Sequence, residues 1–169
     1  NVKPQIADQV SLGYFRNFRN NEFETSLEVY YKNLQNQIDY KNGAELVFNS
    51  TVEAELVFGR GWAYGAELMM KRNFGRLNGW LSYTWSKTIR QFDDINNGDP
   101  YPARQDRTHD VSVVGMYDIS DKLKFSATWV FYTGNAVTFP SGRYVIDGKT
   151  IGYYTERNGY RMPDYHRLD

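Results

Sequence analysis

The stretch "DKLKFSATWVFYTGN" (121–135) alternates between apolar and mostly polar residues. Leu123, Phe125, Ala127, Trp129 and Phe131 occupy every second position, and lysine, serine and threonine stand among the residues between them. Because successive side chains of a strand point to opposite faces, this stretch predicts a β-strand with one apolar face. Whether lipid or other side chains cover that face decides the class of the protein.

The same two-residue period recurs along the chain. It is present at 9–18, 23–33, 62–71, 80–87 and 109–118, which makes six strands with 122–134. Most of these exceed the ~5–6 residues of an ordinary strand and reach the ~9–11 that a tilted strand needs to cross a bilayer. No stretch of the sequence predicts a strong helix. The sequence therefore predicts an all-β protein.

The connections between the predicted strands alternate in length. The short connections are 19–22, 74–78 and 119–121, and the long ones are 34–61, 92–108 and 135–165. Loops this long are uncommon in a compact soluble domain. A membrane barrel, by contrast, has tight turns on its periplasmic side and long loops outside the cell. The pattern thus predicts an antiparallel transmembrane β-barrel with short periplasmic turns and long extracellular loops.

The side chains on the two faces of these strands fit a bilayer. With the short turns placed below, aromatic residues of the apolar face fall near the lower boundary (Tyr14, Phe18, Phe23, Tyr117, Phe125) and near the upper one (Tyr31, Trp62, Tyr64, Trp85, Phe131). Leu27, Val29, Leu68, Val113 and Ala127 lie between them. Two aromatic girdles around an aliphatic band are typical of membrane barrels. Among the outward positions the clear charge is Arg16, near the lower end, where a cation costs little. The other charges fall on the opposite face, and the residues predicted to face the lumen are Glu24, Glu28, Glu67, Lys71 and Lys124.

Length and composition limit the alternatives. The chain has 169 residues, which suits a single domain, and six strands are fewer than the about eight that close the smallest membrane barrels. The ending "DYHRLD" (164–169) resembles the start of a further strand, so we expect six to seven strands of a larger barrel. Lysine and arginine together number 20, as do aspartate and glutamate, so nothing in the charge predicts a nucleic-acid partner. A soluble β-sandwich that binds glycan or protein stays open, because its strands also alternate.

The polar motifs give no catalytic or metal site. "DDINNGD" (93–99) is acidic but fails the EF-hand template, because isoleucine and arginine stand at ligand positions. His109 and Asp110 are adjacent in a strand and point to opposite faces, so they cannot readily form part of a hydrolytic triad. We expect no enzymatic activity, no cofactor and no metal. An outer-membrane barrel enzyme is the second alternative function.

Several longer segments resemble one known family. "VKPQIADQVSLGYFRNF" (2–18), "GWAYGAELMMKRNFGRLNGWLSYTWSKT" (61–88), "PARQDRTHDVSVVGMY" (102–117) and "NGYRMPDYHRLD" (158–169) resemble, in order, strands and loops of TonB-dependent outer-membrane receptors. The resemblance implies a 22-stranded barrel in the outer membrane of a Gram-negative bacterium, with residues 1–169 forming part of that one barrel domain. It also implies an N-terminal plug domain and a TonB box outside this chain. The lumen-facing charges would then contact the plug or line the route of the cargo.

The function that the resemblance implies is the binding and import of a scarce nutrient. A siderophore, haem, a vitamin, a peptide and a glycan all stay open as cargo. The expected partners are outer-membrane lipid, the plug domain, the remaining barrel strands and the TonB–ExbB–ExbD complex, and a surface lipoprotein stays open. Tyrosine and arginine in the long loops suit ligand capture, although such residues could also tie the loops together. The candidate ligand-binding residues are Arg90, Asp93, Asp94, Tyr101, Arg104, Tyr144, Tyr153 and Tyr154.

Overall fold

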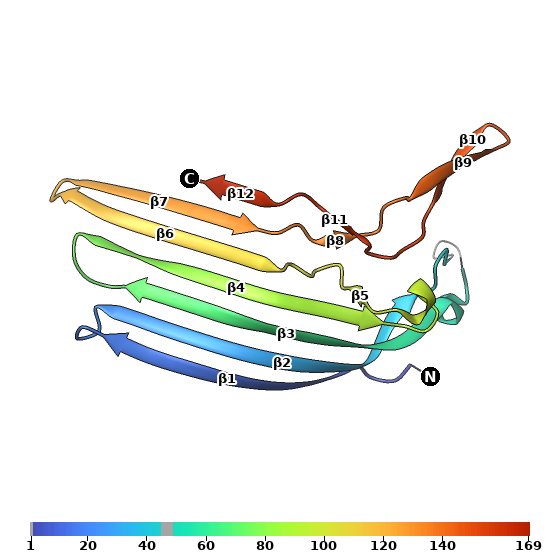
Figure 1. The fold of residues 1–169 in the computed structure, drawn as a ribbon, viewed down its shortest axis with the longest axis horizontal. Helices are drawn as coiled ribbons and strands as arrows, with labels where there is room; N and C mark the ends of the chain where they lie inside the picture. Colours follow the sequence, from blue (N-terminus) through green and yellow to red (C-terminus); the bar gives the residue numbers. More distant parts are fainter. Residues whose placement is uncertain (1, 45–48) are drawn as a thin grey trace.

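The structure, a computed structural model, describes residues 2–44 and 49–169. Its main element is an antiparallel sheet in which the long strands follow one another in the order β1-β2-β3-β4-β6-β7-β12 (Figure 1). These strands are β1 (Ile6–Phe18), β2 (Phe23–Tyr40), β3 (Leu56–Arg72), β4 (Leu77–Gln91), β6 (His109–Ser120), β7 (Leu123–Tyr132) and β12 (Tyr165–Leu168). The path ends at β1 and β12, which do not pair with each other, so the sheet is open rather than closed into a barrel.

The long connections contain short elements that the alternation did not predict. They are the 3₁₀ helices η1 (Val52–Glu55) and η2 (Asn96–Gly98) and the strands β5 (Tyr101–Pro102), β8 (Ala136–Val137), β9 (Gly142–Ile146), β10 (Lys149–Tyr153) and β11 (Tyr160–Arg161). The strand β5 pairs with β4, whereas β9 pairs with β10 and β8 with β11 in two small separate sheets. Figure 1 shows the short turns at one end of the long strands and these elements at the other. The predicted alternation of short and long connections is therefore confirmed.

The predicted strands are all present, but several bounds differ. Five lie within β1, β2, β3, β4 and β6, and the further strand expected near the end of the chain is β12. The connection predicted at 34–61 is wrong, because residues 34–40 and 56–61 pair as continuations of β2 and β3. Backbone pairing continues there although the apolar alternation has stopped, since the ladder does not require an apolar face. The sixth strand stops at Tyr132 rather than at 134.

The register brings the predicted apolar positions onto one face of the sheet. Tyr14 lies opposite Leu27, Leu27 opposite Leu68, Leu68 opposite Tyr83, and Tyr83 opposite Val111. One row of apolar side chains thus crosses five strands. On the other face, Glu24 lies opposite Lys71, Glu28 lies opposite Glu67, and Lys124 forms an ion pair of 3.3 Å with Asp118. Two charges, Arg16 and Lys87, share the apolar face and lie toward its lower and upper ends.

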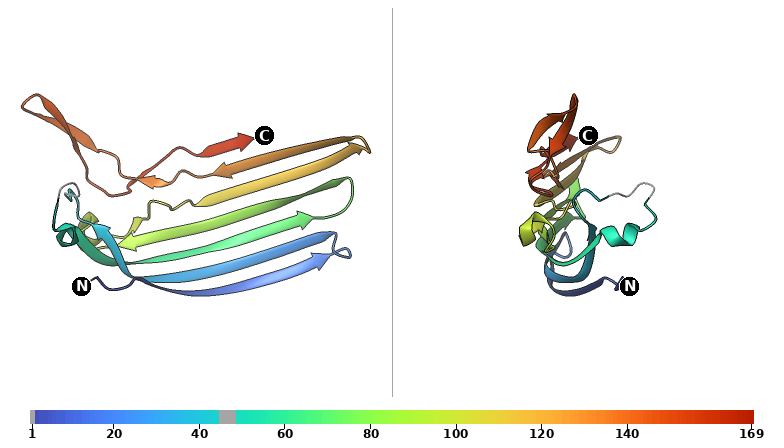
Figure 2. Two further views of the ribbon diagram at one scale, coloured as in Figure 1. Left: turned by 180° about the vertical axis from the view of Figure 1, so that it is seen from behind. Right: turned by 90° about the vertical axis from the view of Figure 1, so that its right-hand side faces the viewer.

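The apolar face does not form a protein core. Leu12 is 75% exposed, Leu27 is 45% exposed and Phe125 is 59% exposed, and the views in Figure 2 show the long strands as one layer. Among the described residues, the hydrophobic core is a small cluster at the loop end of the sheet. A soluble sandwich would bury the apolar side chains of its strands between two sheets, so the fold contradicts this alternative. No helix in the described part of the chain is long and apolar enough to span a membrane.

A β-bulge near the loop end changes which side chains face inward. The register of β2 shifts between Leu34 and Gln37, and Asn36 between them has a φ of +53°. Asparagine tolerates this left-handed conformation better than most residues. Because the extra residue reverses the alternation, Asp39 points to the same face as Glu28. A carboxylate is thereby placed on the inner face, beside the long connections.

Candidate functional site

The connection 92–108 is folded onto the loop end of the sheet. Phe92, Ile95 and Tyr101 are buried and form a cluster with Val57 of β3. The phenyl ring of Phe92 occupies the space over Gly59, where a Cβ atom would lie 2.6 Å from the ring. Since Gly59 faces inward, the connection covers the inner face of the sheet rather than extending freely into solvent. This packing holds the polar side chains of the connection in fixed positions.

Asp39 is the centre of an ion-pair network on this inner face. Its carboxylate forms an ion pair of 2.8 Å with the guanidinium of Arg157 and lies 3.9 Å from the guanidinium of Arg90. The Tyr101 hydroxyl donates to the same carboxylate at 3.4 Å. Burial of the phenol, and then the negative charge of Asp39, raise the pKa of Tyr101 to about 12. The network joins β2, β4 and two long connections.

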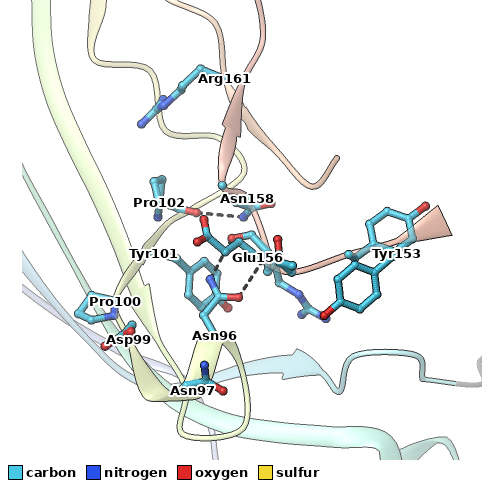
Figure 3. Close-up of a pocket in the computed structure, with 14 residues that line it drawn as sticks. Asn96, Asn97, Asp99, Pro100, Tyr101, Pro102, Tyr153, Glu156, Asn158 and Arg161 are labelled. Atoms are coloured by element: carbon cyan, nitrogen blue, oxygen red, sulfur yellow. Dashed lines mark hydrogen bonds between the residues drawn. The ribbon is translucent and has the colours of Figure 1, made fainter. Parts of the chain in front are cut away.

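Arg157 and its neighbour fasten the three long connections together. The Arg157 guanidinium donates to the carbonyl of Tyr40 at 2.9 Å and to the side chain of Asn42 at 2.9 Å. Its backbone exchanges two hydrogen bonds with the Asn96 side chain, and Asn158 donates to the carbonyl of Pro102 at 2.9 Å (Figure 3). Hydrogen bonds therefore join residues from three separate connections at the loop end.

A second ion pair lies nearby. The carboxylate of Asp106 is almost fully buried, with 2% of the residue exposed, and it is paired with Arg161. It also accepts a hydrogen bond from the backbone N–H of Thr88. The Arg161 guanidinium donates further to the Asp106 carbonyl at 2.6 Å and to that of Gly134 at 3.3 Å. This pair connects the 92–108 connection to the last long connection.

Two hollows flank the segment Tyr153–Arg157. The first hollow, of about 700 Å³, lies between residues 96–102 and 153–161 (Figure 3). The second hollow, of about 660 Å³, lies between residues 39–44 and the segment 152–157. Both volumes are in the range of small-molecule sites, and tyrosine, asparagine and arginine side chains line them.

The eight candidate ligand-binding residues do not form one cluster. Tyr153 and Tyr154 line both hollows and are more than half exposed. Tyr101 lines the first hollow but is 97% buried, and Arg90 lies beside Asp39. Both residues therefore support the structure of the site and offer little surface to a ligand. The others lie elsewhere: Asp93 and Asp94 are exposed in a turn, Arg104 lines a separate hollow, and Tyr144 lies on the β9–β10 hairpin.

Sequence reasoning did not include several residues that organise the site. Asp39 lay inside a predicted connection, and only the bulge at Asn36 places it on the inner face. Asn96 and Arg161 become important through partners that are distant in sequence, such as the 61 positions between Asn96 and Arg157. The sequence offered one signal, the asparagine at position 36 in "NLQNQID" (33–39), because asparagine adopts a positive φ more readily than most residues.

His109, singled out in the sequence, contacts a tyrosine. His109 lies at the first position of β6, where its Nδ1 is 2.8 Å from the Tyr83 hydroxyl on the apolar face. In the described residues no three histidine, aspartate or glutamate side chains are grouped in a way that could hold a metal ion.

Comparison with known families adds the remaining observation. Residues 1–169 match the family described as "TonB dependent receptor-like, beta-barrel". The chain belongs to this family. No curated protein and no solved structure matches the chain.

TonB-dependent receptors are outer-membrane proteins of nutrient uptake rather than enzymes, and they generally work with a plug domain and with TonB. The sheet is thus a segment of a receptor barrel, with the apolar face in the position of the lipid-facing wall. The network around Asp39 and the two hollows lie at the end that carries the long connections. Contact of the inner-face charges with a plug stays a prediction.

The raised pKa of Tyr101 gives a testable result. A phenol whose pKa is raised by folding stabilises the packed loop fully below about pH 10, the value of an unfolded tyrosine, and loses this contribution as the pH rises to about 12. We expect the difference in absorbance at 295 nm between the wild-type receptor and Tyr101→Phe to titrate with a midpoint about two pH units above that of a free phenol. A difference that titrates near pH 10 would show that the ring is solvated.

Proposed function

We propose that this chain supplies part of the barrel wall and three extracellular loops of an outer-membrane receptor that captures a scarce nutrient. The plug domain and the remaining strands of the barrel, which would pair with the free edges of β1 and β12, lie outside this chain. Passage of the cargo would be driven by TonB with ExbB and ExbD. The wall residues Glu24, Glu28, Glu67, Lys71 and Lys124 would contact the plug or line the route of the cargo.

One observation carries this proposal: three long connections, distant in sequence, are fixed around two hollows at the loop end of the sheet. Connections that only closed the barrel end would not need a hydrogen-bonded framework around open cavities. The hollows are lined by Tyr153 and Tyr154, whose rings offer rigid contact area and a hydroxyl hydrogen bond. Ligand capture at this position requires no covalent chemistry.

Uptake by whole cells tests the proposal. Cells with the intact receptor, cells without it and cells without TonB are supplied separately with a labelled ferric siderophore, haem, cobalamin, a peptide and an oligosaccharide. We expect accumulation of one of these to require both the receptor and TonB. Accumulation of all five in the receptor-deleted strain at wild-type rates would contradict the proposal, and hydrolysis of a probe at the cell surface would favour the enzyme alternative.

Variants in the hollows locate the ligand. Replacement of both Tyr153 and Tyr154 by alanine should weaken binding of the transported probe by about 10- to 100-fold, because two rigid contact surfaces are lost. Phe74→Ala is the matched control, since this aromatic residue is similarly exposed (59%) but lies in the turn at the opposite end of the sheet. Equal affinities for the tyrosine variant and the control would place the ligand elsewhere.

A further inference from the structure

A third hollow at the loop end has an unusual lining. It encloses about 450 Å³ and is lined by Arg104, Gln105, Arg107 and Asn135. The side chains are two guanidinium groups and two primary amides, and no carboxylate is among them. All four offer N–H donors, and the two arginines carry permanent positive charge.

These donors have no hydrogen-bond or ion-pair partner in the described part of the chain. In residues 2–44 and 49–169, none of the four side chains makes a hydrogen bond or an ion pair, whereas Arg157 and Arg161 are each paired with an aspartate. The loop arginines therefore divide into two kinds. Arg157 and Arg161 hold the connections together, while Arg104 and Arg107 are free to bind a ligand.

The guanidinium of Arg107 is held in a defined position by aromatic stacking. Its Cζ atom lies 4.2 Å from the centroid of the Tyr132 ring, and this ring is in turn stacked on that of Tyr165 at 4.9 Å. A guanidinium stacked on a ring keeps its N–H edge available for two parallel hydrogen bonds to an oxyanion. Since Tyr132 lies opposite Asp110 on the inner face, the hollow lies on the side along which cargo would pass.

The neighbouring carboxylates do not neutralise the hollow. Asp106 stands between Gln105 and Arg107 in sequence, but its carboxylate is buried and paired with Arg161. Asp164 accepts a hydrogen bond of 3.0 Å from the backbone of Gly134. Asp110 makes no ion pair with Arg107 in the described structure, and none of the three lines the hollow. The local charge of the hollow is thus positive.

We propose that this hollow binds an oxyanion group of the transported nutrient, a carboxylate, sulfate or phosphate, between Arg104 and Arg107. Gln105 and Asn135 donate to the same group. This inference rests on the proposed function and narrows it, because it selects an anionic cargo over a neutral one. A phosphate of outer-membrane lipopolysaccharide offers the same chemistry, so the experiment separates the two sources.

Direct binding tests the site without transport. The purified intact receptor in detergent is titrated with citrate, inorganic sulfate and inorganic phosphate, and separately with lipopolysaccharide. We expect saturable binding of at least one free anion, weakened about 10- to 100-fold in the double variant Arg104→Gln/Arg107→Gln because two charge-assisted contacts are lost. Arg143→Gln is the control, since this arginine is exposed on the β9–β10 hairpin and does not line the hollow. Arg107→Lys should restore only part of the affinity, because an ammonium cannot bind in the planar, two-bonded manner.

The possible results separate the failure of this inference from failure of the proposed function. If the double variant loses lipopolysaccharide binding but binds every free anion as the wild type does, the cargo assignment is overturned. Equal anion affinities for the double variant and Arg143→Gln would overturn it as well. If a labelled nutrient is imported through TonB with the same KM by the wild type and the double variant, the receptor function stands and the oxyanion site is wrong. If anion binding depends on the two arginines but no probe is imported, the site stands and the import function fails.

Discussion

Replacement of Leu68 by arginine is expected to lower the free energy of unfolding of the receptor barrel by about 2–4 kcal/mol, because a cation in the middle of the lipid-facing wall must leave water. Leu68 lies in the apolar row between Leu27 and Tyr83, at mid-height between the two aromatic girdles. The measurement is reversible guanidinium unfolding from phospholipid vesicles, monitored by tryptophan fluorescence.

The residue beside Leu68 provides a control at the same depth. Glu67 precedes it in β3, points to the other face and lies opposite Glu28. Glu67→Arg adds the same side chain but places it on the inner face, where it replaces a like-charge pair by an attractive one. We expect its free energy of unfolding to equal or slightly exceed that of the wild type. A stable Leu68→Arg together with an unstable Glu67→Arg would mean that the two faces are reversed.

Replacement of Arg161 by glutamine has the second large expected effect. It leaves the carboxylate of Asp106 buried with the N–H of Thr88 as its one remaining partner among the described residues. Loss of one member of a fully buried pair costs about 3–5 kcal/mol, and because the Arg161 side chain is 36% exposed we expect about 2–3 kcal/mol. The cost falls on the packing of the 92–108 connection. The barrel wall itself should stay folded.

Proteolysis of the connection measures this effect. Where the loop opens and closes quickly, cleavage follows the population of the open form, so trypsin should cut after Arg104 and Arg107 about 30- to 150-fold faster in Arg161→Gln. Arg143→Gln should leave the rate unchanged. The double variant Asp106→Asn/Arg161→Gln should be cut more slowly than Arg161→Gln, because no buried charge is left without a partner. An unchanged rate in Arg161→Gln would show that the pair does not hold the connection.

Much of the wall could be predicted from short stretches of sequence. The alternation in 23–33 and 62–71 identified parts of β2 and β3, and the two-sided distribution of their residues agrees with the observed pairs, such as Leu27 with Leu68. The predictions were less accurate where the alternation weakened. Residues 34–40 read as a connection because they are polar, yet they extend β2 beyond the apolar band.

The candidate ligand site was only partly predictable. Tyrosine and arginine in the long connections marked the correct end of the sheet, and Tyr153 and Tyr154 do line the hollows. The same reasoning also selected Asp93 and Asp94, which lie in an exposed turn outside them. Residue type alone does not distinguish an arginine that binds a ligand from one that holds two loops together.

The sequence by itself determined the strands, their two faces and the end at which the long loops lie, because a two-residue period and a short turn are local properties of the chain. Only the tertiary structure decided which arginines are paired with a carboxylate. Asp39 reaches Arg157 through a bulge in β2, and Asp106 reaches Arg161 across the loop end, whereas Arg104 and Arg107 meet no carboxylate among residues 2–44 and 49–169. Such pairings join residues far apart in the chain, so they depend on the folded path and not on neighbouring residues.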